Sequence, residues 1–303
     1  MIRKKHLIVI AGPTAVGKTS TTIKIAQHFD CEIINSDSRQ FYREMTIGTA
    51  KPSPDELKTV HHHFIDNLSI HDAYNVGHFE KDTKRLLKDI FKTKDVVLMT
   101  GGSGLYIRAV TEGLDKFPDI SGDILKSLNH LYETKGISTL QEELKQVDLE
   151  YYKTIDINNH RRIIRALSVF KASGQPFSSF LNQEKEKKDF EIHYILLERN
   201  REELYQRINL RVDLMIEAGL EKEARSLFQF KGLKSLQTVG YQEFFSYFDG
   251  TVSRDEAIEL IKRNSRRYAK RQMTWFRKRP FWVRFVAEEV DGILEFLGGE
   301  IDK

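Results

Sequence analysis

An apolar run followed at once by a glycine-rich motif constrains this chain more than any other feature. Leu7–Ala11 leads directly into residues 12–19, Gly-Pro-Thr-Ala-Val-Gly-Lys-Thr, which is the pattern of a P-loop. A buried parallel strand, a loop that wraps phosphates and a helix that opens behind it are expected in that order. We expect these residues to surround a diphosphate or triphosphate: Gly12, Thr14, Ala15, Val16, Gly17, Lys18 and Thr19. Lys18 supplies a positive charge and the Thr19 hydroxyl a ligand for Mg²⁺.

The first third of the chain alternates strands with helices. We predict strands at 7–11, 32–34 and 96–99 and helices at 18–29 and 76–92. This alternation predicts an α/β fold, a P-loop NTPase-like parallel sheet covered by helices on both faces. Ligands of such a sheet bind at the carboxyl ends of its strands, where the P-loop, Asp37 and Gly101-Gly102 fall.

The middle of the chain has a different character. Residues 114–189 carry polar helical segments without a strong strand, and we interpret them as a helical insertion domain. The core domain then comprises 1–113 and 190–303. In its second part we predict a strand at 193–197, one long helix from Arg201 to about Phe230, a helix from Arg254 and a short apolar segment, Phe281–Val286.

Composition excludes several classes of protein. The chain has 303 residues, 40% apolar and 30% charged, as in globular proteins of one large or two modest domains. Its single cysteine, Cys31, excludes a disulfide framework and a multi-cysteine zinc site. No run approaches the roughly 20 apolar residues of a membrane span. We expect a cytoplasmic, monomeric protein with no membrane contact.

Basic residues are concentrated near the C-terminus. Between Lys262 and Ala287 there are ten Lys or Arg residues and no acid, and the aromatic residues Tyr268, Trp275, Phe276, Phe281 and Trp282 are interleaved with them. A second cluster is His160-Arg161-Arg162 with Arg165. In a nucleic-acid interface, cations pair with phosphates and aromatic rings stack on bases. We therefore favour a nucleic-acid ligand for these clusters over the alternative, a solvated helix face whose aromatic residues belong to the core.

Asp37 is the strongest candidate for chemistry outside the P-loop. It follows the second strand, and a carboxylate there can ligate Mg²⁺ through water or accept a substrate proton. The alternative is an Asx turn. The strand at 96–99 ends in Thr100-Gly101-Gly102-Ser103 without the aspartate that holds Mg²⁺ in ATPases, so a motor ATPase or regulatory GTPase is disfavoured.

Two further groups need an interpretation. Arg207 and Arg211 are four residues apart on a predicted helix, so both project from one face, where they can close over phosphates or form surface ion pairs. His61-His62-His63 suggests a metal site, but adjacent histidines point apart. No acid or cysteine stands at helical or zinc-finger spacing, so turn and packing roles are predicted.

Four segments together resemble the tRNA dimethylallyltransferase (tRNA isopentenyltransferase) family. They are residues 12–19; Asp37–Tyr42 leading to Ile47-Gly48-Thr49-Ala50-Lys51-Pro52; Gly101–Tyr106; and Lys270–Arg277. Val239-Gly240-Tyr241 and residues 161–167 add to the match, which runs to roughly residue 280. The Ile-Gly-Thr-Ala-Lys-Pro segment is the most specific part.

The resemblance implies that dimethylallyl diphosphate gives its five-carbon group to the exocyclic amine of the adenine at tRNA position 37, beside the anticodon, with Mg²⁺ as cofactor. Asp37 is then the base for the amine, and Ser103 and Arg211 act with the P-loop on the leaving diphosphate. The implied contacts with the tRNA anticodon stem-loop are Asp37, Ser38, Arg39, Gln40, Arg161, Arg162, Arg165, Gln237, Gly240, Tyr241, Gln242, Lys270, Arg271, Gln272, Trp275 and Arg277.

This chain departs from the family pattern at three places. Ser103 stands where threonine is more usual, Arg39 where a small or apolar residue is, and His160-Arg161 where Pro-Gln is. Three other functions stay open from the residues alone: prenylation of free adenine nucleotides, a small-molecule kinase, and a non-catalytic RNA-binding ATPase. The kinase leaves Ile47–Pro52 and the C-terminal basic cluster unexplained.

Overall fold

A parallel sheet forms the centre of the larger of two compact units. The computed structural model describes residues 4–184 and 187–301. One unit contains the chain up to Glu112 and from Lys187 onward, and the other is Gly113–Glu186. Within the described residues the sheet has six parallel strands in the order β3-β2-β4-β1-β5-β6. The strands are β1 (His6–Ala11), β2 (Ile33–Asn35), β3 (His62–His63), β4 (Val96–Gly101), β5 (Glu191–Glu198) and β6 (Val283–Val286).

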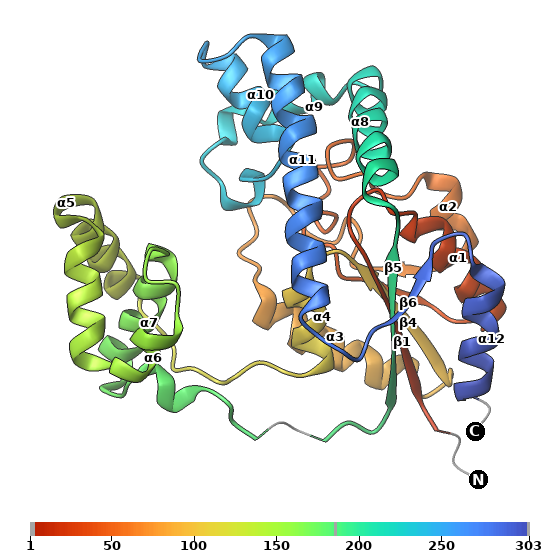
Figure 1. The fold of residues 1–303 in the computed structure, drawn as a ribbon, viewed down its shortest axis with the longest axis horizontal. Helices are drawn as coiled ribbons and strands as arrows, with labels where there is room; N and C mark the ends of the chain where they lie inside the picture. Colours follow the sequence, from red (N-terminus) through yellow and green to blue (C-terminus); the bar gives the residue numbers. More distant parts are fainter. Residues whose placement is uncertain (1–3, 185–186, 302–303) are drawn as a thin grey trace. The chain divides into compact units, whose positions relative to one another are not determined.

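Helices cover both faces of this sheet, as the alternating pattern predicts (Figure 1). Ile8 and Ile10 of β1 pack on one face with α1 (Lys18–His28) and α12 (Val290–Ile301). Leu7 and Val9 point to the other face, toward α3 (Val76–Ile90) and α4 (Gly104–Thr111). Side chains of successive strand residues alternate between faces, so β1 is buried on both sides, as a central parallel strand must be.

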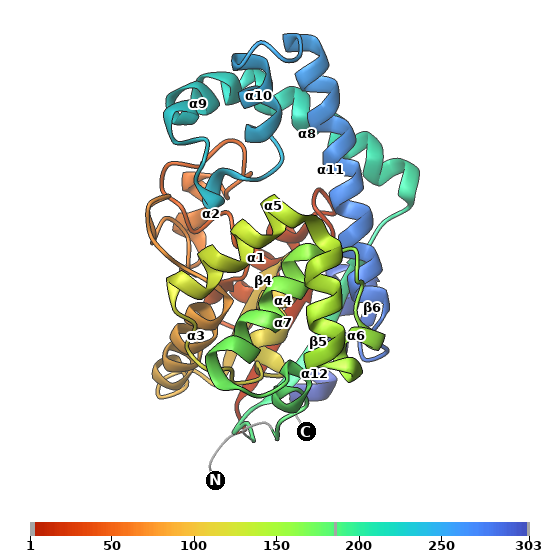
Figure 2. The same ribbon diagram turned by 90° about the vertical axis from the view of Figure 1, so that its left-hand side faces the viewer.

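A bundle of helices continues from the carboxyl end of β5. It consists of α8 (Arg201–Glu217), α9 (Leu220–Leu227), α10 (Tyr241–Phe248) and α11 (Arg254–Arg277), with short 3₁₀ turns at Phe228–Phe230 and Lys234–Leu236. Figure 2 shows α9 and α10 beside one end of the long α11. Their shared core includes Tyr42, Met45 and Ile70, so the bundle supports the segment between β2 and α3. That segment also contains α2 (Pro54–Thr59).

Most predicted elements are confirmed, and one is wrong. The single helix expected over 201–230 is broken, because α8 ends at Glu217 and Gly219 adopts φ 100°, a left-handed conformation that stops a helix. The apolar segment Phe281–Val286 provides the edge strand β6, which pairs with β5. The helix from Arg254 is found as α11.

The second unit is helical. It contains α5 (Gly122–Val147), which bends at Gly136, then α6 (Leu149–Thr154), α7 (His160–Ser173) and a 3₁₀ turn at Phe177–Phe180. Leu140, Leu144, Ile163 and Leu167 form the centre of its separate core. Within the described residues of both units, no helix is long and apolar enough to cross a bilayer.

Candidate active site

The P-loop forms the floor of a cavity at the carboxyl end of the sheet. Thr14, Ala15, Gly17, Lys18 and Thr19 line this cavity of ≈ 420 Å³. Gly12 and Val16 are buried beneath it. Gly17, with φ 119°, turns the chain into α1, whose first residue is Lys18. The helix therefore starts at the cavity, with its positive end available to an anion.

Lys18 is the central cation of the cavity. Its Nζ donates to the carbonyl oxygens of Gly12 (2.9 Å) and Pro13 (2.8 Å), which hold the side chain over the loop. Burial and then the nearby charge of Arg211 lower the pKa of Lys18 to about 8, while Asp37 opposes this shift. A cation held in this way, without a carboxylate bonded to it among the described residues, is suited to pair with phosphate oxygens.

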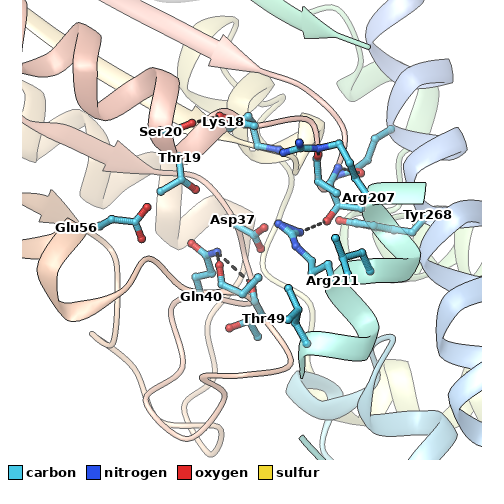
Figure 3. A pocket seen from close by; sticks show the side chains of 17 residues that line it. Lys18, Thr19, Ser20, Asp37, Gln40, Thr49, Glu56, Arg207, Arg211 and Tyr268 are labelled. Atoms are coloured by element: carbon cyan, nitrogen blue, oxygen red, sulfur yellow. Dashed lines mark hydrogen bonds between the residues drawn. The ribbon is translucent and has the colours of Figure 1, made fainter. Parts of the chain in front are cut away.

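Two arginines from α8 cover the P-loop. Arg207 Nε donates to the carbonyl of Ala15 (2.9 Å), and Arg211 Nη1 donates to the Thr14 hydroxyl (2.7 Å). Both side chains extend from one face of α8 into the cavity (Figure 3). Lys18 and the two arginines thus place three positive charges around the space above the loop, so an anion with several oxygens is the ligand that fits best.

Asp37 faces these cations across the cavity. Its Oδ1 accepts the Arg39 backbone N–H (3.0 Å), and its own N–H donates to Asn35 Oδ1 (3.1 Å). Asp37 therefore forms an Asx turn and also lines the cavity, so the two alternatives do not exclude each other. The charge of Asp37 acts on both Lys18 and Arg211, and Figure 3 shows its carboxylate beside the Arg211 side chain. A base thus lies beside an anion site in one cavity.

The donors around Thr19 fit a hard cation. Thr19 and Asp37 line a smaller hollow of ≈ 50 Å³ that also reaches Thr100. Hydroxyl and carboxylate oxygens gather there beside the phosphate loop. Mg²⁺ prefers oxygen ligands and usually binds through one or two carboxylates together with substrate phosphates. The residues present therefore suit Mg²⁺.

Residues of α11 close the cavity from another side. Gln272 is buried; its Oε1 accepts the Thr14 N–H (2.9 Å) and its Nε2 donates to the Gly102 carbonyl (3.0 Å). One turn earlier on the same face, Tyr268 lines the cavity and its hydroxyl bonds to Ser103. Ser103 Oγ also lies 3.4 Å from the Ser38 N–H.

Glycines after β4 allow this close approach of α11. A Cβ on Gly102 would lie 2.1 Å from Gln272 Nε2, and a Cβ on Gly104 would lie 2.1 Å from Trp275 Nε1. A side chain at either position would displace the side chain of Gln272 or Trp275. The Gly-Gly-Ser-Gly turn therefore has a packing role in addition to its place beside the P-loop.

The Ile47–Pro52 segment forms the wall opposite the P-loop. Gln40 Nε2 donates to the carbonyls of Thr49 and Ala50, both at 3.1 Å, which joins this wall to the turn that carries Asp37. Lys51 pairs with Asp66 below it. Thr49 and Ala50 line the cavity, so the most specific segment of the sequence shapes the site directly.

Glu223 of α9 holds this wall in place, and sequence reasoning missed it. Its two carboxylate oxygens accept the backbone N–H groups of Thr46 (3.0 Å), Ile47 (2.8 Å) and Gly48 (2.9 Å) and the Tyr241 hydroxyl (2.6 Å). Because three of these partners are backbone N–H groups far away along the chain, no local pattern marks Glu223. Tyr268 was also missed, although its i, i+4 spacing from Gln272 is a usable signal.

The residues with expected RNA contacts divide by exposure. Exposed side chains are Arg161, Arg162 and Arg165 on α7, Gln237 and Gln242, and Lys270, Arg271 and Arg277 on α11. Ser38, Arg39, Gln40 and Trp275 are half-buried; Gly240, Tyr241 and Gln272 are buried. Arg39 Nη1 donates to the Ser235 carbonyl (2.8 Å), which accounts for an arginine at this position. The structure brings Asp37–Gln40 and α11 together around one cavity.

Comparisons with known proteins agree on one family. Residues 40–279 match the sequence model of the family described as IPP transferase. The chain is 52% identical over 299 residues to the tRNA dimethylallyltransferase of Christiangramia forsetii, covering 98% of this chain and 99% of that protein. It is 42% identical to the tRNA dimethylallyltransferase of Cytophaga hutchinsonii, covering 99% and 98%.

Solved structures of the same family are similar to this chain. The full-length tRNA isopentenylpyrophosphate transferase of Bacillus halodurans superposes with a TM-score of 0.73 at 36% identity, covering 99% of this chain and 97% of that one. A eukaryotic dimethylallyltransferase described as acting on tRNA gives a TM-score of 0.78 at 28% identity, covering 89% and 69%. The P-loop and Asp37 precede the region matched by the family model but lie within the span shared with these proteins.

Proposed function

The chain belongs to the IPP transferase family, and from this premise we propose that it transfers a dimethylallyl group from dimethylallyl diphosphate to tRNA. The acceptor is the exocyclic amine of the adenine at tRNA position 37, beside the anticodon, and diphosphate is released. The observation that carries this proposal is the placement of Asp37, a base, in the same cavity as Lys18 and Arg211. A kinase or ATPase needs no base for a weak amine nucleophile at this point.

The cavity residues account for the bond changes. The adenine amine attacks the allylic carbon and forms the C–N bond while the C–O bond to diphosphate breaks, and the electron pair of that bond leaves with the diphosphate. Asp37 takes the proton that the amine loses. Lys18, Arg207 and Arg211 stabilise the negative charge that grows on the departing oxygen, because they are already in place before the reaction.

Mg²⁺ would be held by Thr19, with Asp37 reaching it only through water, and it would neutralise charge on the diphosphate. Ser103 stands behind Tyr268, whose hydroxyl it contacts, and we assign it to orienting groups on the leaving-group side.

The tRNA is expected to meet the exposed cations of α11 and α7. Lys270, Arg271 and Arg277 on α11, and Arg161 with its neighbours on α7, offer charge to the phosphates of the anticodon stem-loop. The target adenine must leave the base stack to reach Asp37, which costs a few kcal/mol. Tyr241 and Gln272 are buried, so in this proposal they shape the site instead of touching RNA.

Membership of the family also bears on where the protein works in the cell. A tRNA-modifying enzyme of this kind works where tRNA matures, so we place it in the cytoplasm. We also propose that the protein acts as a monomer. Sedimentation of the protein with and without tRNA tests this.

The test is a transfer assay with Mg²⁺, labelled dimethylallyl diphosphate and unmodified tRNA, with AMP as a parallel acceptor. We expect label in tRNA, and no label when the adenine beside the anticodon is replaced by guanine. Asp37→Asn should lower transfer by about 10²–10⁴-fold, the range for a general base, whereas Asp255→Asn, at a nearly fully exposed carboxylate, should leave it unchanged. Label in AMP alone, or phosphate transfer from ATP, would contradict the proposal.

A further inference from the structure

A cluster of two histidines and one glutamate lies at the edge of the sheet, outside the proposed active site. In the parallel pairing of β2 with β3, Ile33 lies opposite His62. Glu32 therefore stands beside His61, and side chains alternate so that Glu32, His61 and His63 share one face. His62 points to the other face, with Nδ1 2.8 Å from the Val60 carbonyl.

The three side chains converge. Glu32 Oε2 lies 2.6 Å from His63 Nε2, and the rings of His61 and His63 meet edge-to-face with centroids 4.4 Å apart. One ligand atom from each residue lies within 4.8 Å of the other two. The acid, Glu32, lies just before the neighbouring strand β2 and about thirty positions away in the chain, so local spacing does not reveal it.

The backbone fixes these positions. The Ile33 N–H donates to the His61 carbonyl (2.9 Å), and the Leu98 N–H donates to the Glu32 carbonyl (3.0 Å). The ligand-bearing Cα atoms are therefore set by sheet hydrogen bonds, and only side-chain torsions need to change for the three atoms to surround an ion. Such a preformed set loses little conformational freedom on binding.

We propose that Glu32, His61 and His63 bind one zinc-class transition-metal ion. Two imidazole nitrogens and a carboxylate oxygen are a ligand set that zinc uses, at about 2.0–2.2 Å, with a fourth position left for water. Magnesium, which prefers all-oxygen sites, is not expected here. This site is separate from the P-loop, and the proposal does not depend on the function proposed above.

The ion would act as a brace for the edge of the sheet. β3 has only two residues, and directly after it the Phe64 carbonyl accepts a hydrogen bond from Asn35 Nδ2 (3.0 Å). Asn35 ends β2 and its side chain also holds the backbone of Asp37. Joining Glu32, the residue before β2, to His61 and His63 would therefore stabilise the strand pair that leads to the Asp37 turn.

A second cluster offers a comparison. His6 Nδ1 lies 3.0 Å from His193 Nε2, and Glu191 lies 4.0 Å from His6. Here the two ring nitrogens already bond to each other, both rings are buried, and Lys4 pairs with Glu191 at 3.0 Å. A cation would have to displace all of these interactions, so we assign the metal to the first cluster.

The experiment uses the full chain, stripped of metal and kept in excess Mg²⁺ so that oxygen sites are filled. Calorimetric titration with Zn²⁺ should give one tight site, and Co²⁺ should give the visible absorption of a four-coordinate ion. His61→Ala, at an exposed position, and Glu32→Gln should each weaken binding at least tenfold. His130→Ala, an exposed histidine on α5, is the matched control and should bind normally. Zn²⁺ should also raise the unfolding temperature of the wild type but not of His61→Ala.

Absence of a tight Zn²⁺ site in the wild type would overturn the proposal. So would binding that His61→Ala and Glu32→Gln leave unchanged, or binding that is lost only in His193→Gln, which would assign the ion to the second cluster. Circular dichroism of each variant separates loss of a ligand from loss of the fold. Transfer activity is not needed for any of these readouts.

Discussion

The two walls of the cavity are built in different ways. The anion wall consists of one contiguous loop, residues 12–19, and two arginines one turn apart on α8. The acceptor wall, formed by the Asp37 turn and Ile47–Pro52, is held by a carboxylate from a distant helix, Glu223 on α9. The first wall binds charge with its own side chains, and the second depends on others for its shape.

Because of this difference, substitutions in the two walls should affect different properties of the protein. A change in the anion wall removes a charge that meets the ligand, so it should act on the reaction and leave folding nearly intact. A substitution in the support of the acceptor wall removes no side chain that contacts the ligand. It should act on the stability of a loop, and on the reaction through that loop.

Lys18→Met should have the largest effect on the reaction. The variant keeps most of the side-chain volume but removes the charge that Gly12 and Pro13 hold over the P-loop. We expect kcat/KM for dimethylallyl diphosphate to fall about 10²–10³-fold, as for loss of one preorganised donor to a developing anion. Lys24→Met, an exposed lysine on the same helix, is the control. Equal activity of the two variants would contradict the role given to Lys18.

Glu223→Ala, in contrast to Lys18→Met, should act mainly on the stability of the protein. It leaves three backbone N–H groups and the Tyr241 hydroxyl without their carboxylate, and loss of such charge-assisted bonds costs about 3 kcal/mol in unfolding free energy. Urea unfolding measures this loss. Glu221→Ala, which breaks an exposed pair with Arg254, should cost less than about 1 kcal/mol. A Glu223→Ala protein as stable as Glu221→Ala would show that the acceptor wall does not need its support.

Gln272→Ala tests the support that α11 gives to the anion wall. The variant leaves the Thr14 N–H and the Gly102 carbonyl unpaired, so we expect kcat/KM to fall about tenfold or more, the equivalent of roughly 1–3 kcal/mol for such groups. Binding of dimethylallyl diphosphate should weaken even without tRNA.

Lys270→Ala provides the contrast on the same helix. Its side chain is exposed, so it should weaken only tRNA binding and reduce the salt dependence of that binding. If Gln272→Ala affects tRNA binding alone, the side chain contacts RNA and its positioning role is wrong.

The same division explains what the sequence could predict. The P-loop, the parallel sheet and the arginine pair on α8 follow from residues close together in the chain, and all three are found. The break at Gly219 was missed because apolar spacing continues across it, although a glycine there is a stop signal. Glu223 as the partner of Ile47, and Glu32 as the partner of His63, join segments that only the fold brings together.

The opposite end of the sheet gives a third region to compare, because its buried histidines do not touch the cavity. His6 begins β1 and stacks on His193 of β5. Burial is the main cause that lowers the pKa of each ring, and for His193 the charge of His6 adds to it. The charged groups around the pair are Lys4, Asp95, Glu191 and Glu300; the three acids oppose the shift, but burial outweighs them.

A lowered histidine pKa makes stability depend on pH in a definite direction. Below the ordinary histidine pKa of about 6.5, the unfolded chain binds protons that the folded chain does not, so the free energy of unfolding rises with pH and is lost as pH falls through this range. The slope is at most about 1.4 kcal/mol per pH unit for each histidine. Urea unfolding at pH 7.5 and 5.5 measures it. In His193→Gln, where one proton site is removed and the mutual repulsion with His6 ends, the loss between these two pH values should be smaller than in the wild type. An equal loss in both proteins would place the acid sensitivity elsewhere, in the carboxylates that pair with lysines and arginines over the rest of the surface.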